Sequence, residues 1–304
     1  MILKKIFTII TLTISLAVYS QEETSKNVII YLDLSDRLER EDQINNDKQL
    51  IKHCVNLFKT VVESSYVSGK LWSSDAISIN FKPPMRDTEL ASNLTIDFET
   101  INDKDKVDAY KIFFPQEEDP TIFKYIDKVY ELAYAQHPKY PGSDFYEFLR
   151  EDLPYLVKDK DPDGYDYENI LIVITDGYVY MSKQNPKREN NKLGHLEGPR
   201  LDALRNNSKW EELYETNNWG MISTGKKFNN LKVLGLQFYP DCIVNSIQPR
   251  TNLRPLKPCI NEFDVLKKFW TDWFEEMGVQ DIRFLKRKDN INPSIGAINN
   301  ILNK

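Results

Sequence analysis

The chain has few of the residues that usually mark catalytic or nucleotide-binding sites. Its 304 residues include only three histidines, three cysteines and eleven glycines. The histidines (His53, His137 and His195) show no metal-ligand spacing. Neither a Gly-x-Ser-x-Gly turn nor a glycine-rich phosphate loop is present. These absences argue against serine hydrolases and nucleotide-binding enzymes.

Basic clusters and long apolar segments are scarce as well. The chain carries 40 basic and 46 acidic side chains, a net charge of −6, and it has no basic run. We therefore expect no nucleic-acid partner. Beyond the first twenty residues no segment is apolar for long enough to span a bilayer, so we expect no membrane span in the mature chain.

Residues 1–20 resemble a secretory signal peptide. Lys4 and Lys5 precede an uncharged, mostly apolar stretch from residue 6 to 18, and cleavage near Ser20 is expected. The alternative is an uncleaved N-terminal anchor, because the cleavage signal is weak. After cleavage 38 basic and 46 acidic side chains are left, a net charge of −8. We expect an exported protein, either periplasmic or extracellular.

Two apolar stretches each end in a group of acidic and hydroxyl residues. Residues 28–32 lead into Asp33-Leu34-Ser35, and residues 170–174 lead into Thr175-Asp176-Gly177. Strands that are apolar on both faces are typical of a parallel sheet covered by helices. The carboxyl ends of such strands meet at one edge, where ligands bind. Asp33, Ser35 and Asp176 at that edge would form a hard-oxygen site suited to Mg²⁺ or Ca²⁺.

The rest of the chain alternates between expected strands and helices, which predicts an open, mostly parallel α/β (Rossmann-like) sheet with helices on both faces. We expect one domain over residues 27–286, with a polar insertion at about 178–227 and a C-terminal tail at 287–304. Ser143 is the expected N-cap of a helix, with Asp144 in its first turn. Helices are expected over 44–65, 104–113, 121–135 and 262–277, and further strands over 76–81, 94–98, 231–239 and 279–285.

These motifs, in this order, resemble the von Willebrand factor type A (VWA) domain family. In that family a first strand ends Asp-x-Ser-x-Ser, a later loop supplies a hydroxyl, and a later strand ends in Asp. The resemblance implies a metal-ion-dependent adhesion site formed by Asp33, Ser35, Ser143 and Asp176. It also implies a divalent cation (Mg²⁺, Mn²⁺ or Ca²⁺) and a protein or other ligand that completes the ion's coordination with an acidic group.

One residue departs from the family pattern. Arg37 stands where the motif has its second Ser, and a guanidinium cannot ligate a cation. We expect a binding module rather than an enzyme, with two alternatives: a metal-dependent hydrolase on the same sheet, or a scaffold with a non-functional metal site. Ser35 disfavours the hydrolase, because phosphoryl-transferring aspartate enzymes of similar topology have a second Asp there.

A second candidate cation site is Asp159-x-Asp161-x-Asp163-Gly164, which has the spacing of a calcium loop. The match fails further on, because Ile170 stands where the bidentate Glu belongs and Pro162 stiffens the loop. We favour a solvated acidic turn, with weak Ca²⁺ binding as the alternative.

The three cysteines give little information. Cys54 falls in an apolar helical stripe and is expected to be a buried small hydrophobe. Cys242 and Cys259 bracket a proline-rich loop and could form a disulfide in an oxidising compartment. An odd count leaves that pairing undecided.

Overall fold

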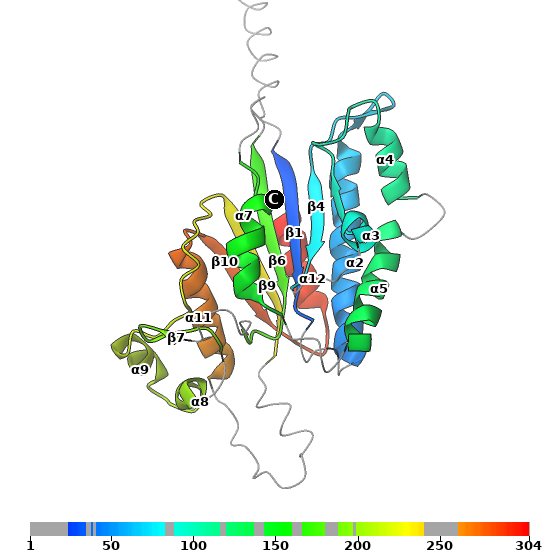
Figure 1. The fold of residues 1–304 in the computed structure, drawn as a ribbon. Helices are drawn as coiled ribbons and strands as arrows, with labels where there is room; N and C mark the ends of the chain where they lie inside the picture. The colour runs from blue at the N-terminus through cyan, green and yellow to red at the C-terminus, as the bar shows by residue number, and fades with distance from the viewer. Residues whose placement is uncertain are drawn as a thin grey trace, which may run out of the picture.

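The computed structural model describes residues 24–34, 38, 41–82, 88–115, 120–136, 143–159, 166–179, 188–196, 199–239 and 261–303. Its centre is a six-stranded sheet in the order β10-β9-β6-β1-β4-β5 (Figure 1). All neighbours are parallel except β5, which runs antiparallel to β4 at one edge. The strands are β1 (Ser25–Leu32), β4 (Ala76–Asn80), β5 (Thr95–Asp97), β6 (Tyr167–Ile174), β9 (Leu231–Phe238) and β10 (Asp281–Lys286).

The two central strands bury both of their faces. Along β1, Val28, Ile30 and Leu32 belong to one hydrophobic cluster, whereas Ile29 and Tyr31 belong to the other. β6 alternates in the same way, because successive side chains of a strand point to opposite faces. The predicted open α/β sheet with helices on both faces is confirmed.

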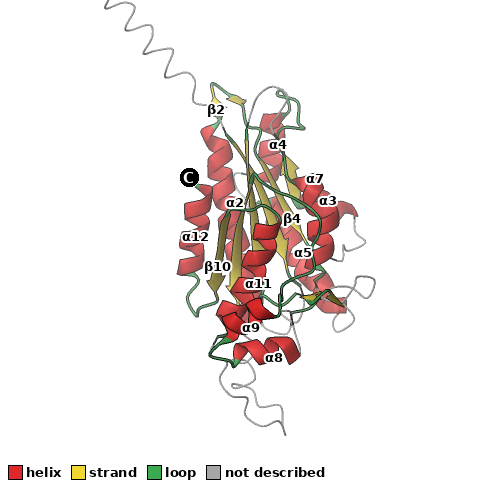
Figure 2. Ribbon diagram, turned by 90° about the vertical axis from the view of Figure 1, so that its left-hand side faces the viewer, coloured by secondary structure: helices red, strands yellow, loops and turns green. Residues whose placement is uncertain are grey.

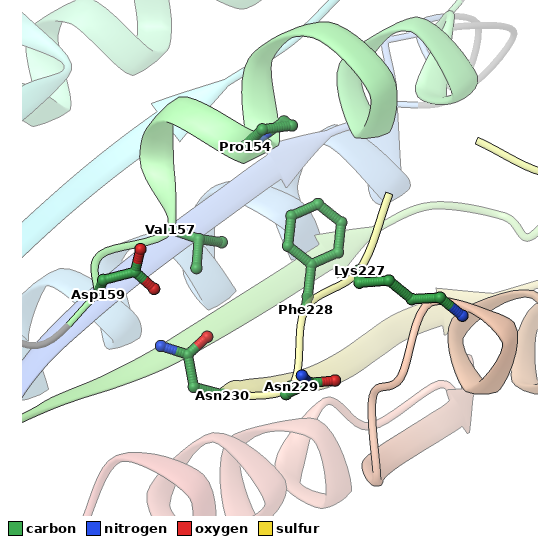
Figure 3. A pocket seen from close by; sticks show the side chains of 7 residues that line it. All are labelled: Pro154, Val157, Asp159, Lys227, Phe228, Asn229 and Asn230. Atoms are coloured by element: carbon green, nitrogen blue, oxygen red, sulfur yellow. The ribbon is translucent and has the colours of Figure 1, made fainter. Parts of the chain in front are cut away.

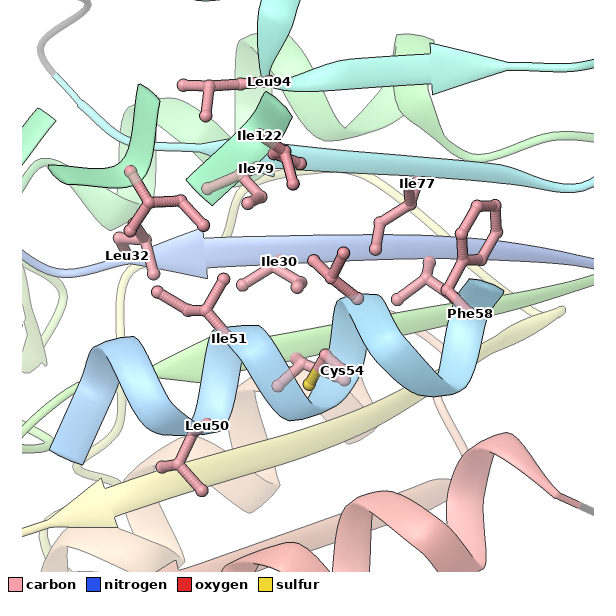
Figure 4. Packing of buried hydrophobic residues seen from close by; sticks show 14 of the residues in the cluster. Ile30, Leu32, Leu50, Ile51, Cys54, Phe58, Ile77, Ile79, Leu94 and Ile122 are labelled. Carbon is pink, nitrogen blue, oxygen red and sulfur yellow. The ribbon is translucent and has the colours of Figure 1, made fainter. Parts of the chain in front are cut away.

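The first face is covered by three helices that follow β1, β4 and β5, and by the last helix of the chain. Leu50, Ile51 and Cys54 of α2 belong to the same hydrophobic cluster as the inward side chains of β1 and β4, and Leu50 lies on the side of α2 away from these strands (Figure 4). α2 and α12 contact each other on this face (Figure 2). The helices are α2 (Glu41–Ser64), α3 (Thr88–Asn93), α5 (Thr121–Gln136) and α12 (Asn292–Leu302), with α4 (Lys106–Phe113) near the end of α2.

The second face is covered by α11 (Glu262–Glu276) and by a continuous helical segment. That segment is α6 (Phe145–Glu147), a π-helical turn (Phe148–Asp152) and α7 (Leu153–Leu156). Its core is aromatic: Phe145 lies against Tyr31 and Trp270, with ring centroids 4.8 Å apart in each pair. This packing places the start of α6 directly above the end of β1.

Two segments extend the fold beyond the strand–helix repeat expected from the sequence. The polar insertion includes α8 (Pro199–Arg205), α9 (Trp210–Thr216) and a small hairpin, β7 (Arg188–Glu189) with β8 (Lys192–Leu193). Leu204 and Trp210 bury it against the α11 side of the core. The C-terminal tail contains α12, whose Ile298 and Ile301 are buried in the first cluster, so the fold continues past residue 286.

The remaining described hairpin, β2 (Tyr66–Val67) with β3 (Lys70–Leu71), connects α2 to β4.

Candidate functional site

The topology brings two acidic strand ends together. From β1 the chain builds outward through β4 and β5, then returns to the other side of β1 through β6, β9 and β10. The side of the sheet on which new strands are added therefore changes between β1 and β6. In doubly wound sheets, ligands bind at such a switch point. Asp33 follows β1, and its N–H donates to the carbonyl of Ile174 at the end of β6 (3.0 Å). Asp33 and the Thr175–Asp176 pair thus lie on adjacent strands at the carboxyl edge.

Asp33 is buried and hydrogen-bonded to a residue that the motif did not assign. The Thr175 hydroxyl donates to Asp33 Oδ2 (2.7 Å), and Asp33 is only 4% exposed. The hydroxyl also accepts the N–H of Gly177 (3.0 Å). The alternation of side chains along a strand was the available signal for this contact. Thr175 is two residues after Val173, and Asp33 is two residues after Tyr31, so each lies on the same face of the sheet as that earlier residue.

Asp176, the carboxylate that the motif did assign, lies one residue further along. Its Oδ1 accepts the N–H of Tyr178 (3.0 Å), and its carbonyl accepts the N–H of Tyr239 (2.9 Å). Asp176 is therefore part of the turn at the same sheet edge. It is not among the residues that line the depression around Asp33.

Ser143 reaches the site from the segment before α6, although not as a helix cap. Its Oγ lies 2.5 Å from the Tyr31 hydroxyl, and both groups are buried. The expected N-cap at Ser143 is wrong, because Asp144 is the cap: its Oδ1 accepts the N–H of Glu147 (2.9 Å). With the carboxylate of Asp144 satisfying the helix N-terminus, the Ser143 hydroxyl is engaged by Tyr31 instead.

Asp33 and Ser143 line one narrow depression on the α11 side of the sheet. Its polar wall is made by the side chains of Tyr31, Asp33, Ser143 and Thr175, and its apolar wall by aromatic and aliphatic groups. The remaining lining residues are Phe145, Val173, Tyr178 and Trp270. Two of the four predicted ligands are thus brought together, and Asp176 lies beside them in the turn.

The turn after β6 is held by α11. Trp270 Nε1 donates to the carbonyl of Gly177 (2.8 Å), and the Tyr178 hydroxyl donates to Glu262 Oε1 (2.5 Å). Arg205 of α8 donates to the same carboxylate oxygen (3.0 Å), and Glu262 is buried. Burial lowers the pKa of Arg205, but the hydrogen bond to Glu262 and the nearby negative charges of Glu262 and Asp202 act together against burial and leave that pKa raised. The insertion is therefore linked to the site through Glu262.

The donor atoms at this edge are carboxylate and hydroxyl oxygens, which suit Mg²⁺, Mn²⁺ or Ca²⁺ rather than thiolate-preferring metals. Within the described ranges no group of three or more His, Cys, Asp or Glu side chains could hold a metal ion. A site here would thus depend on hydroxyl ligands as well as carboxylates. Ser35 and Arg37 of the motif lie outside the described residues.

Several other expectations fall wholly or partly outside the described residues. They are the signal peptide, the Cys242–Cys259 pairing, and Asp161 and Asp163 of the calcium-like loop. Asp159 is described and exposed, at the opposite edge of the sheet. Cys54 is buried as predicted, and burial raises the pKa of its thiol to about 12.

Among the helices that the structure describes, none has both the length and the apolar character needed to cross a bilayer. No protein-family model matches this sequence, and no curated protein matches it.

Proposed function

We propose that this protein is an exported, VWA-like binding module that engages an acidic group of a partner through a divalent cation at the carboxyl edge of its sheet. The observation that carries the proposal is the meeting of Asp33 and Ser143 in one depression at the switch point between β1 and β6. These residues come from distant parts of the chain and were both assigned to the ion from the motif.

The neighbours of the two ligands support the same function. Thr175 orients the Asp33 carboxylate, and Tyr31 holds the Ser143 hydroxyl at the same edge. Asp33, Ser35, Ser143 and Asp176 would hold the ion, which supplies a positive charge when bound. A carboxylate of the partner would complete the coordination, as the resemblance implies.

The insertion supports selectivity for particular partners. Arg205 of α8 and Tyr178 of the turn both bind Glu262, so α8 is coupled to the turn that follows β6. Changes in the insertion would therefore alter the approach to the sheet edge without changing the ligands themselves.

Thermal unfolding with Mg²⁺, Mn²⁺, Ca²⁺ or a chelator tests the proposal. A bound ion stabilises the folded state by mass action, by about 1.4 kcal/mol at ten times its Kd. We expect the melting temperature to rise by a few degrees with at least one ion. Asp33→Asn and Ser143→Ala should abolish the rise, and Arg37→Ser, which restores the family's second hydroxyl, should increase it. Asp108→Asn, an exposed change on α4, is the matched control.

Three outcomes would contradict the proposal. If none of the three ions raises the melting temperature, the proposed cation site is wrong. A shift that survives Asp33→Asn but is lost in Asp159→Asn or Asp161→Asn would move the ion to the calcium-like loop. Turnover of a phosphate monoester that depends on Asp33 would replace the binding function with hydrolysis.

A further inference from the structure

A second cavity lies at the opposite, amino edge of the sheet (Figure 3). It has a volume of about 390 Å³, near the small end of the range for ligand pockets, about 300–1,000 Å³. One wall is formed by the end of α7 and the residues after it, and the other by the chain that leads into β9. The lining residues are Pro154, Val157, Asp159, Lys227, Phe228, Asn229 and Asn230. The eight residues of β6 separate this cavity from Asp33 by roughly 25 Å.

The wall that carries Asp159 is held in place by the side-chain amides of three asparagines. Asn169 is fully buried. Its Oδ1 accepts the N–H of Lys158, and its Nδ2 donates to the carbonyl of Lys158, both at 2.8 Å. Asn230 Nδ2 donates to the same carbonyl (3.0 Å), and Asn27 Nδ2 donates to the carbonyl of Leu156 (2.7 Å). The backbone on either side of Val157 is therefore fixed to β1, β6 and the start of β9. These hydrogen bonds therefore fix the position of the neighbouring residue Asp159.

The cavity has an excess of hydrogen-bond acceptors at one end. Within the part of the chain that the structure describes, the Asp159 carboxylate and Asn230 Oδ1 have no hydrogen-bond or ion-pair partner. The only cationic residue of the lining, Lys227, donates its ammonium group to the carbonyl of Glu276. Figure 3 shows its side chain directed away from Asp159. The charge at the Asp159 end is therefore not balanced by the lining.

The middle of the cavity is apolar. Phe228 is buried, and its ring lies beside Pro154 and Val157, with Val157 between the ring and Asp159 (Figure 3). An apolar wall that ends in a carboxylate and a carbonyl oxygen matches a ligand with an aliphatic stem and a cationic, donor-rich head. Arginine and lysine side chains have this form, because their methylene stems pack on apolar surface while the charged head meets acceptors.

We propose that this cavity binds an alkyl guanidinium or alkyl ammonium group, such as an arginine or lysine side chain of a polypeptide. The head pairs with Asp159 and Asn230 Oδ1, and the stem lies on Phe228 and Val157. This inference is independent of the carboxyl-edge site, since the two share no residue.

Binding of N-acetyl-arginine amide to the full-length protein, measured by calorimetry, tests the proposal. N-acetyl-citrulline amide is the matched probe, because it has nearly the same shape without the charge. We expect the arginine probe to bind at least tenfold more tightly than the citrulline probe. Asp159→Asn, which preserves the shape of the side chain, should remove that preference. Lys227→Met should preserve it, because the Lys227 head points away from Asp159.

Free amines and polypeptides are distinguished by comparing agmatine with a short peptide that carries one arginine. Tighter binding of the peptide assigns the site to a protein partner, whereas equal binding assigns it to a small cation, and both support an alkyl-cation site. The proposal is overturned by equal affinity for the arginine and citrulline probes, or by no binding of either at millimolar concentration. It is also overturned if the preference survives in Asp159→Asn. Because Asp33→Asn should leave this binding unchanged, failure here is separable from failure at the carboxyl edge.

Discussion

The hydroxyl of Thr175 donates a hydrogen bond of 2.7 Å to Asp33 Oδ2, joining the ends of β1 and β6 at a buried position. The two residues are 142 positions apart in the chain. This contact orients the carboxylate on which the proposed cation site depends, and it also connects the two central strands of the sheet.

We predict that Thr175→Val destabilises the fold. Valine has nearly the same shape but cannot donate to Asp33, and the free energy of unfolding should fall by about 1–3 kcal/mol because a buried acceptor loses a partner. Urea unfolding measures the change. Thr175→Ser should recover most of it. Thr60→Val, at an exposed position of α2, is the matched control and should change stability by less than about 0.5 kcal/mol. Equal effects of the two valine variants would contradict the prediction.

Gly177 should not tolerate alanine. Its φ is +99°, and a Cβ there would lie 2.6 Å from the Phe238 ring. Gly177→Ala should therefore carry two costs, about 1–2 kcal/mol for the left-handed backbone and about 1–3 kcal/mol for the overlap. Gly69→Ala separates them, because Gly69 has a φ of +80° and no atom within 4 Å of its Cβ position. Unfolding measurements that give equal losses for the two variants would show that the Phe238 ring moves away freely.

Asp75 should make stability depend on pH. Burial raises the pKa of its carboxyl, although hydrogen bonds from the Ser73 hydroxyl and the Lys26 N–H act in the opposite direction. A carboxyl whose folded pKa is raised contributes stability below its unfolded pKa of about 3.9, and this contribution is lost as pH rises through the folded pKa. Asp75 therefore contributes more to stability at low pH than at neutral pH.

Replacing Asp75 tests the direction of this pH dependence. The free energy of unfolding of Asp75→Asn, relative to wild type, should be higher at about pH 7 than at about pH 4. Urea unfolding at the two pH values gives the comparison. Asp108→Asn, on the surface of α4, controls for the general effect of removing one negative charge. A relative stability of Asp75→Asn that falls as the pH rises would contradict the direction of the pKa shift.

The thiol of Cys54 should be unreactive in the folded protein. The thiol is buried between α2 and the sheet, and its pKa of about 12 leaves roughly one thiolate in ten thousand at pH 8. In a Cys242→Ser/Cys259→Ser variant, where Cys54 is the one remaining thiol, a disulfide reagent should label the protein only as fast as it unfolds. Adding urea should therefore raise the labelling rate in step with unfolding. Rapid labelling without denaturant would show that Cys54 is accessible in the folded state.

The fold was largely predictable because the burial of side chains leaves a local pattern in the sequence. Strands such as residues 28–32 and 170–174 are apolar at every position, and a strand of this kind requires a covered sheet face on each side. The helical spacing of Ile51, Val55, Phe58 and Val62 predicted α2, and all four side chains are buried in the first cluster. Acidic groups after two such strands also placed the candidate site at the carboxyl edge.

The partners at that edge were not predictable, because hydrogen bonds between distant segments leave no local pattern. The sequence shows Thr175 only as a hydroxyl residue after an apolar stretch, yet its hydroxyl contacts Asp33. Ser143 was expected to cap a helix, yet it contacts Tyr31, and Asp144 is the cap. Both outcomes depend on which strands are neighbours and on how α6 lies above β1.

The apolar residues of β1 and β6 and the acidic and hydroxyl groups that follow them are local features, so they can be recognised from the amino-acid sequence. That the two strands are adjacent at the switch point, with Ser143 beside them, is known only from the folded chain. Strand order is set by packing across the whole sheet, because each strand could pair with segments that lie far away in the chain.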